Sequence, residues 1–193
     1  MGIEITGWGK CTPSAVLTNN DLESILDTDD EWITTRTGVK QRRIAEAPLS
    51  ELGTIAAKHA LASADKDPNE IDAVMMATCT PEFLIPSTAS RVQMNIGNNT
   101  AAAFDFNSAC TGFVYGLTTA YSMIHSGIFN NVLLVGGEKV SYLLDWSARD
   151  TAVLFGDGAG AVLIEKTNTD SKLHSSKLTC DPFLGAALML KNF

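Results

Sequence analysis

Hydrophobic positions along the chain fall into two kinds of stretch. Short apolar runs without regular polar alternation indicate strands that are covered on both faces. Between them, apolar residues recur every three or four positions, as in amphipathic helices. Strands that alternate with helices predict right-handed βαβ crossovers in a mainly parallel sheet. The predicted strands cover 3–9, 71–79, 101–106 and 131–136; the predicted helices cover 19–26, 50–64, 87–96 and 111–125, and a further helical turn begins at 27.

The segment from Thr151 to Glu165 has a different pattern. Apolar residues stand on both sides of Gly156-Asp157-Gly158-Ala159-Gly160, which predicts a hairpin with a glycine-rich tight turn. A phosphate-binding loop is the alternative, but the run lacks a Gly-Lys-Ser/Thr ending and no helical pattern follows it. From Thr167 onward the chain becomes polar, so the hairpin would be the last regular element of the main unit.

Composition and charge narrow the class of protein. Of the 193 residues, 45% are apolar and 19% are charged, which is typical of a soluble globular domain. The net charge of −8 argues against a protein that coats nucleic acid. No apolar run reaches the ~18 residues of a membrane span, and the first ten residues lack a signal-peptide pattern. We therefore expect a protein that binds neither nucleic acid nor membrane.

The four cysteines are far apart and form no C-x-x-C pair. This spacing disfavours a zinc cluster or a disulfide framework, so we predict no metal site. Reduced thiols are typical of a cytoplasmic enzyme. The four are Cys11, Cys79, Cys110 and Cys180.

Cys110 is the strongest candidate for chemistry. It lies in the turn between the predicted strand 101–106 and the predicted helix 111–125. There the unpaired N–H groups and the dipole of the helix favour an anion, so the thiol should lose its proton more easily than a free one. The residues from Ser108 to Gly112 are mostly small and leave room for a substrate. A cysteine that only packs is the alternative, because free Cys is among the most buried residue types.

The only concentrated basic stretch contains Lys40, Arg42 and Arg43. A solvated face and a phosphate grip are both compatible with this pattern. The phosphate grip gains support from Trp32 and Arg36 nearby, which could stack on a flat purine ring.

Taken together, the elements and motifs resemble the N-terminal part of β-ketoacyl-acyl-carrier-protein synthase III, of the thiolase superfamily. The similarity covers nearly the whole chain, and the Trp-Ile-x-x-Arg-Thr-Gly stretch is specific to the synthase III branch. The resemblance implies an α/β fold, the N-terminal half of a five-layered αβαβα architecture, over 1–170, and the start of an incomplete C-terminal half over 171–193. Four motifs carry it: Asp27–Gly38, the Cys110 turn, Val135-Gly136-Gly137-Glu138 and Phe155-Gly156-Asp157-Gly158-Ala159-Gly160.

The resemblance also implies roles for particular residues. Cys110 would be the nucleophile that accepts the acyl group. Ile85 would reach across a homodimer interface into the acyl pocket of the partner subunit. Trp32 and Arg149 would sandwich the adenine of coenzyme A. The coenzyme A site would comprise Thr28, Trp32, Arg36 and Arg149.

The implied reaction has two steps. An acyl group moves from acyl-CoA to Cys110, since a thiolate can both attack a thioester and leave from one. Malonyl-acyl-carrier protein then loses carbon dioxide and attacks the acyl-enzyme, which gives the 3-oxoacyl product that begins fatty acid synthesis. Acyl-CoA is a substrate here, and no cofactor is implied. Lys40, Arg42 and Arg43 would meet the acidic carrier protein or the phosphates of coenzyme A.

The second step requires a His and an Asn, which in the family lie in the C-terminal half. None of the three histidines of this chain matches that position. We interpret His59 as a packing residue on the apolar face of its predicted helix. His125 is some four helical turns from Cys110, too far to touch the sulfur. His174 lies in the polar C-terminal part of the chain. Because none of the three histidines matches the family's catalytic position, we expect that the chain alone is not the complete catalyst.

Two other interpretations stay open. One is a related acyltransferase, or an enzyme similar to hydroxymethylglutaryl-CoA synthase, with a different general base. The other is a truncated or non-catalytic thiolase-fold subunit that binds coenzyme A, acyl groups or a condensing partner. In that case one half of the fold would expose a broad apolar face, which normally marks an interface.

Overall fold

The computed structural model describes residues 2–187 and 189, and its centre is a five-stranded sheet in the order β1-β7-β6-β4-β5. Three strands are parallel: β4 (Ala73–Ala77), β5 (Ala102–Phe106) and β6 (Asn131–Lys139). The strand β7 (Asp157–Thr167) runs antiparallel to β6 on one side and to β1 (Gly2–Cys11) on the other. The predicted mainly parallel, mixed sheet is therefore confirmed.

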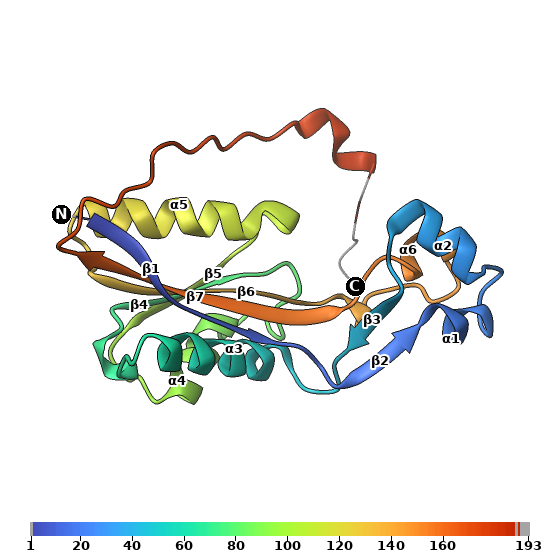
Figure 1. Ribbon diagram of the computed structural model, residues 1–193, viewed down its shortest axis with the longest axis horizontal. Coiled ribbons are helices and arrows are strands. Elements are labelled where there is room, and N and C mark those ends of the chain that lie inside the picture. The colour runs from blue at the N-terminus through green and yellow to red at the C-terminus, as the bar shows by residue number, and fades with distance from the viewer. Residues whose placement is uncertain (1, 188, 190–193) are drawn as a thin grey trace.

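Helices cover both faces of this sheet. Figure 1 shows α3 (Leu49–Ser63) and α4 (Thr88–Ile96) on one face and α5 (Gly112–His125) on the other. The resulting helix–sheet–helix layers match the thiolase-like α/β architecture that the resemblance implies. Residues Val132–Val135 of β6 are fully buried because this strand is central and covered on both faces.

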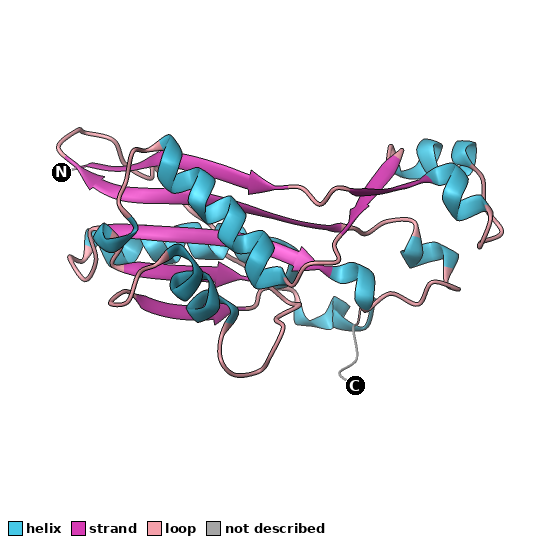
Figure 2. Ribbon diagram, turned by 90° about the horizontal axis from the view of Figure 1, so that it is seen from below, coloured by secondary structure: helices cyan, strands magenta, loops and turns pink. Residues whose placement is uncertain are grey.

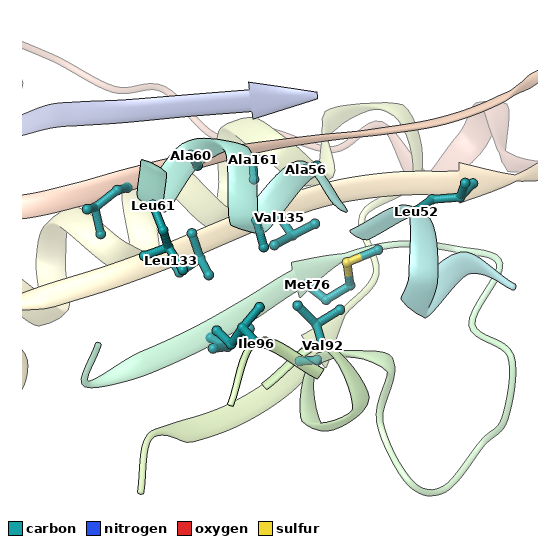
Figure 3. Packing of buried hydrophobic residues seen from close by; sticks show 14 of the residues in the cluster. Leu52, Ala56, Ala60, Leu61, Met76, Val92, Ile96, Leu133, Val135 and Ala161 are labelled. Atoms are coloured by element: carbon teal, nitrogen blue, oxygen red, sulfur yellow. The ribbon is translucent and has the colours of Figure 1, made fainter. Parts of the chain in front are cut away.

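The larger hydrophobic core lies between the sheet and the pair α3 and α4 (Figure 3). A second core lies under α5, where Ile124, Leu134 and Met75 are completely buried. The side chains labelled in Figure 3 come from α3, α4 and three strands: Leu52, Ala56, Ala60, Leu61, Met76, Val92, Ile96, Leu133, Val135 and Ala161.

The helix α3 lies unusually close to β1. A side chain at Gly9 would overlap the backbone of α3 at Ala56 and Ala60, and one at Gly7 would overlap the carbonyl oxygen of Ala60. Glycine is therefore required at both positions for this packing distance, because any Cβ would push the helix away from the strand.

A smaller unit stands at one end of the main sheet, at the right of Figure 1. It contains the two-stranded sheet of β2 (Ala15–Thr18) and β3 (Gln41–Ile44), and the helices α1 (Asn19–Glu23), α2 (Asp30–Thr37) and α6 (Arg149–Ala152). Its own hydrophobic core is formed by Leu22, Leu26, Ile33, Ala152 and Val153.

Four 3-10 turns complete the described elements. They are η1 (Pro68–Glu70), η2 (Ala109–Thr111), η3 (Val140–Tyr142) and η4 (Pro182–Ala187). After β7 the chain runs outside α5 towards η4 (Figure 1). Figure 2 shows the molecule from below, with helices of the α3 and α4 side in front of the strands. The backbone N–H of Ile3 donates to the carbonyl of Ser171 at 3.0 Å, which ties the start of this segment to β1. The division into 1–170 and 171–193 stays a prediction.

The predicted hairpin over Thr151–Glu165 is wrong. The first residues of that segment belong to α6 and a turn, Gly156 precedes the strand, and Asp157–Gly160 are the first residues of the continuous strand β7. A Cβ at Gly156 would lie 2.9 Å from the Arg43 carbonyl oxygen, so a side chain would be crowded there. At Gly158 and Gly160 a Cβ would make only ordinary contacts, at 3.5 and 3.8 Å, so close packing requires glycine at Gly156 alone.

The other predicted elements differ from the structure mainly at their ends. Thr18 caps α1 and Ser87 caps α4, each with its side chain accepting from a backbone N–H of the first turn. The helix α3 begins at Leu49, after Pro48, one residue before the predicted start. None of the helices over residues 2–187 combines the length and hydropathy needed to cross a bilayer.

Candidate functional site

The carboxyl ends of β4, β5 and β6 meet at one edge of the sheet, because these strands are parallel. Residues Thr78–Thr80 follow β4, the turn that carries Cys110 follows β5, and Glu138 lies near the end of β6. In open α/β sheets, sites form at the carboxyl ends of parallel strands. This edge is therefore the first place to look for chemistry.

Cys110 lies in η2, between the end of β5 and the first residue of α5, and it is exposed. The turn is held by Asn107, whose side-chain oxygen accepts from the Ala109 N–H at 3.0 Å, and by the Ser108 carbonyl, which accepts from the Thr111 N–H at 3.1 Å. Ala109 has a φ of 45°, an uncommon left-handed conformation for a residue with a side chain. The predicted strand-to-helix turn is confirmed and its thiol is exposed, while the role of Cys110 as a nucleophile stays a prediction.

The helix α5 starts directly over the end of β4. A Cβ at Gly112 would lie 3.2 Å from the Cβ of Ala77, so only a very small residue fits there. The buried face of α5 carries Gly112, Gly116, Ala120 and Ile124. Phe113 is 38% exposed, and the inner part of its side chain lies against Gly136 of β6.

Glu138 organises the edge next to Cys110. Its carboxylate accepts hydrogen bonds from the hydroxyls of Thr78 at 3.0 Å and Thr80 at 2.5 Å. It also accepts from the backbone N–H of Cys79 at 2.8 Å. One carboxylate thus fixes the whole segment that follows β4. Sequence reasoning recorded Glu138 only as part of a motif and assigned it no role; the signal was an acidic residue directly after a buried strand.

The same carboxylate affects the thiol of Cys79. The pKa of Cys79 is raised to about 11, first by burial and then by the negative charge of Glu138 and a hydrogen bond to it. The charge of Cys110 makes a smaller contribution in the same direction, which places the two thiols in one electrostatic environment. Cys79 is consequently protonated at neutral pH, and sequence analysis gave it no role.

The second site is in the smaller unit and is centred on Trp32. The helix α2 that carries Trp32 is capped by the Asp29 carboxylate, which accepts from the Trp32 N–H at 2.6 Å. The guanidinium carbons of Arg36 and Arg149 each lie 4.5 Å from the centroid of the Trp32 ring, a cation–π geometry. Arg149 also donates from Nη1 to the carbonyl of Asp27 at 2.8 Å. The structure therefore brings Arg149 onto the pair Trp32 and Arg36 of α2, from which it is separated by more than a hundred residues in the sequence.

A surface hollow of about 430 Å³ adjoins this arginine–tryptophan cluster. It is lined by Ile25–Asp27 and by Ser147–Asp150, so Arg149 forms part of its wall. The hydroxyl oxygen of Thr28, the next residue after this lining, is buried and has no hydrogen-bond partner within the described residues. The fourth predicted coenzyme A residue thus lies beside the other three, with an unsatisfied polar atom.

The basic stretch does not form the surface that the sequence predicted. Arg42 is only 5% exposed, because the alternation of β3 directs it inward, where it donates to Asn19 and to the Val153 carbonyl. Arg43 is half-buried and donates to the Pro13 carbonyl. Lys40 alone is freely exposed, so a joint role of the three in binding phosphates or a carrier protein is wrong.

Ile85 is 86% exposed, on the loop between β4 and α4. Its neighbours Phe83 and Leu84 are 51% and 96% exposed, so the tip of the loop presents an apolar surface. The base of the loop is held by Glu82, which pairs with Arg91 at 3.0 Å. The predicted role of Ile85 in the acyl pocket of a partner subunit stays a prediction.

The histidines lie away from Cys110. His59 is exposed, with Nδ1 3.0 Å from the Lys10 carbonyl, so its interpretation as a packing residue is wrong. His125 stacks on Tyr121 at a centroid distance of 5.8 Å, at the far end of α5. Among the residues that the structure describes, there is no group of three or more His, Cys, Asp or Glu side chains that could hold a metal ion.

Comparison with known proteins gives a consistent result. Residues 104–182 match the family model of 3-oxoacyl-[acyl-carrier-protein (ACP)] synthase III. A β-ketoacyl-[acyl-carrier-protein] synthase III 2 from Vibrio cholerae is 54% identical over 178 residues, 92% of this chain and 49% of the relative. A β-ketoacyl-[acyl-carrier-protein] synthase III from Aquifex aeolicus is 47% identical over the whole of this chain and 62% of the relative.

The fold agrees with the sequence comparison. The crystal structure of 3-oxoacyl-[acyl-carrier-protein] synthase III from Aquifex aeolicus superposes with a TM-score of 0.86 and 50% identity, over 87% of this chain and 55% of that one. The chain spans about half the length of the curated relatives it matches. By sequence and by fold, the chain is similar to β-ketoacyl-acyl-carrier-protein synthase III, of the thiolase superfamily, over about half of the length of those relatives.

Proposed function

We propose that the protein containing this chain transfers an acyl group from acyl-CoA to Cys110. It then condenses that group with malonyl-acyl-carrier protein to form a 3-oxoacyl-acyl-carrier protein. The observation that carries the proposal is the exposed Cys110 in its left-handed turn at the carboxyl edge of the sheet. The names of the relatives support the substrates, and the condensation would be the initiating step of fatty acid synthesis.

Cys110 is suited to the first step. It precedes the first turn of α5, whose N-terminal N–H groups favour negative charge on the attacking sulfur and on the oxygen that develops in the tetrahedral intermediate. The sulfur attacks the thioester carbonyl, the carbon–sulfur bond to coenzyme A breaks, and coenzyme A leaves as a thiolate that takes up a proton. The acyl group stays on Cys110 as a thioester, ready for the second donor.

We assign the nucleotide end of coenzyme A to the cluster of Trp32, Arg36 and Arg149, with Thr28 beside it. A purine between Trp32 and Arg149 needs about 3.5 Å on each side, or about 7 Å in total. Arg149 now lies 4.5 Å from the Trp32 ring centroid and is bonded to Asp27. Binding would therefore move the Arg149 guanidinium outward, so that it stacks on the purine instead of on the Trp32 ring. The unpartnered Thr28 hydroxyl could donate to the nucleotide at the same time.

A homodimer is part of the same proposal. The strand β5 is at the edge of the sheet, and the apolar loop tip with Phe83, Leu84 and Ile85 projects from the connection that follows β4. An unpaired strand edge and exposed apolar side chains both favour pairing with a second copy. Ile85 would then reach the acyl pocket of the partner subunit.

The test is the intact mass of the purified protein before and after incubation with acetyl-CoA. We expect a gain of one acetyl group, which disappears in Cys110→Ser and is released when malonyl-acyl-carrier protein is added. An adduct that persists in Cys110→Ser would contradict the role of this residue. Coenzyme A binding without any adduct would instead favour a non-catalytic subunit, and condensation products of another type would favour a related acyltransferase.

A further inference from the structure

Arg42 is a buried charge that the proposed reaction does not use. It is 5% exposed, and in the described part of the chain no carboxylate forms an ion pair with it. Burying a guanidinium is costly unless its N–H groups are satisfied, and apolar residues of similar volume are often as stable. A buried arginine at this place therefore calls for an explanation other than stability.

One arm of Arg42 reaches the helix that carries Arg149. Its Nη2 donates to the carbonyl oxygen of Val153 at 2.5 Å. Val153 is the C-cap residue of α6, and Arg149 is the first residue of that short helix. The position of the Val153 carbonyl therefore determines where α6 places the Arg149 side chain.

The other arm reaches the helix that carries Trp32. Nη1 of Arg42 donates to the side-chain oxygen of Asn19 at 2.7 Å. The amide nitrogen of Asn19 in turn donates to the Asp30 carboxylate at 2.7 Å, at the first residue of α2. Asn19 is 1% exposed, so the bond between Arg42 and Asn19 is buried, and the connection reaches the exposed start of α2 at Asp30.

We infer that Arg42 is a positioning residue that fixes the spacing between Trp32 and Arg149, and hence the fit of the coenzyme A nucleotide. The inference rests on the proposed function of that site. The apolar core of the small unit holds α2 and α6 together, but apolar contacts are not directional. A planar guanidinium with two bonded arms fixes distance and orientation at once.

The effect on binding should be large, because the Arg149 side chain can swing outward and stack on a purine only if α6 holds its backbone at the right distance from Trp32. A misplacement of about 1 Å can cost about a hundredfold in rate when it alters substrate positioning. Loss of Arg42 should therefore impair acyl transfer from a donor that carries the nucleotide. A donor that lacks the nucleotide should be unaffected, because Cys110 and its turn belong to the main sheet.

The experiment compares two donors in the purified full-length protein. Rates of Cys110 acylation are measured by mass spectrometry with acetyl-CoA and with S-acetylpantetheine, which has the same thioester without the nucleotide. In the unaltered protein we expect a preference for acetyl-CoA. In Arg42→Met that preference should fall about ten- to hundredfold, while the S-acetylpantetheine rate stays unchanged. Arg43→Met, a neighbouring arginine with one backbone bond, is the matched control and should keep the preference.

The variant Arg42→Lys tests whether the two hydrogen-bonding arms of Arg42 or only its positive charge are required. Lysine keeps the charge but lacks the planar fork, so we expect it to recover only part of the preference. Full recovery with lysine, or a preference that survives Arg42→Met, would overturn the role of Arg42 and leave the proposed function intact. Loss of both rates in Arg42→Met together with full preference in Arg42→Lys would also overturn it, because Arg42 would then serve folding alone.

The unaltered protein tests the proposed function separately. Equal rates with the two donors would contradict a nucleotide site at Trp32. Absence of acylation from both donors would contradict the acyltransferase itself. Neither result depends on the Arg42 variants, so the two failures are distinguishable.

Discussion

Replacing Glu138 by glutamine should lower the pKa of Cys79. Burial is the larger cause of its raised value of about 11, and the Glu138 carboxylate contributes next, by its charge and by its hydrogen bond. Glutamine keeps an oxygen that can accept from the Cys79 N–H, but it removes the negative charge. The pKa should therefore fall below about 11 and stay above the ordinary value of 9.0, because burial remains.

The effect on stability follows from the three hydrogen bonds that end on this carboxylate. Hydrogen bonds to charged groups contribute about 1.5–3 kcal/mol and neutral ones about 0.5–1.5 kcal/mol. Glu138→Gln should thus cost about 1 kcal/mol per bond, or at most about 3 kcal/mol in the free energy of unfolding. Glu138→Ala leaves two threonine hydroxyls and the Cys79 N–H without this partner and should cost more.

The assay is the rate of alkylation of Cys79 by iodoacetamide as a function of pH, followed in the peptide that contains it. Because only the thiolate reacts, the rate rises tenfold per pH unit until the pH reaches the pKa. The curve of the variant should level off at a lower pH than the curve of the unaltered protein. Glu51→Gln is the matched control: burial and then the charge of Glu51 raise the pKa of Cys11, so this variant should shift the Cys11 curve and not the Cys79 curve.

Two outcomes would refute this reasoning. An unchanged curve would show that burial alone raises the pKa of Cys79, and a fall to 9.0 would show that burial contributes nothing.

The raised pKa of Cys79 also makes the stability of the folded protein depend on pH. The folded state favours the neutral thiol, so its stabilising contribution is present below the ordinary pKa and is lost as the pH rises from 9.0 towards about 11. Removing the Glu138 charge should narrow this interval.

Two further predictions concern the fold around the site. Gly9→Ala should destabilise the protein by about 1–3 kcal/mol in urea unfolding, because the new methyl group overlaps the backbone of α3. Gly160→Ala on the neighbouring strand is the control: its Cβ would lie 3.8 Å from the Gly9 carbonyl, an ordinary contact, so little change is expected and an equal loss would contradict the packing argument. Asp157→Ala should cost at least about 3 kcal/mol, because the carboxylate accepts from Ala45 N and from Ser141 N and Oγ at 2.6–2.9 Å. Asp157→Asn should keep part of the stabilisation that Asp157→Ala loses. Identical free energies of unfolding for the two variants would disprove the contribution of the hydrogen bonds.

The order of strands and helices could be predicted because each main element has a strong pattern of its own. The buried run Val132–Val135 and the turn at Cys110 are examples, and both lie where the sequence placed them. The glycine run over 156–160 was predicted as a tight turn because local sequence does not distinguish such a turn from the start of a strand. Pairing with β1, more than a hundred residues earlier, places Ala159 and Gly160 in the sheet.

The candidate site was predicted unevenly for a similar reason. The exposed position of Cys110 follows from a local turn, which sequence patterns describe well. Arg42 was misplaced because an inward position for a basic residue depends on distant partners, Asn19 and Val153. Glu138 was given no role because its three donors come from another strand. Contacts between distant segments are the part that composition and periodicity do not contain.

The position of β7 in the sheet has a consequence for synthesis on the ribosome. Its partner β1 is the first strand of the chain, yet the paired residues are separated by about 150 positions. At about 5–20 residues per second, β1 waits on the order of ten seconds before β7 emerges beside it. Among the described residues β7 is the strand that pairs with β1, which lies at the edge of the sheet. During that interval β1 therefore has α3 to pack against but no strand to form hydrogen bonds with. A chaperone that binds extended segments would find this first strand open, and slow translation between the codons for β6 and β7 would lengthen its exposure.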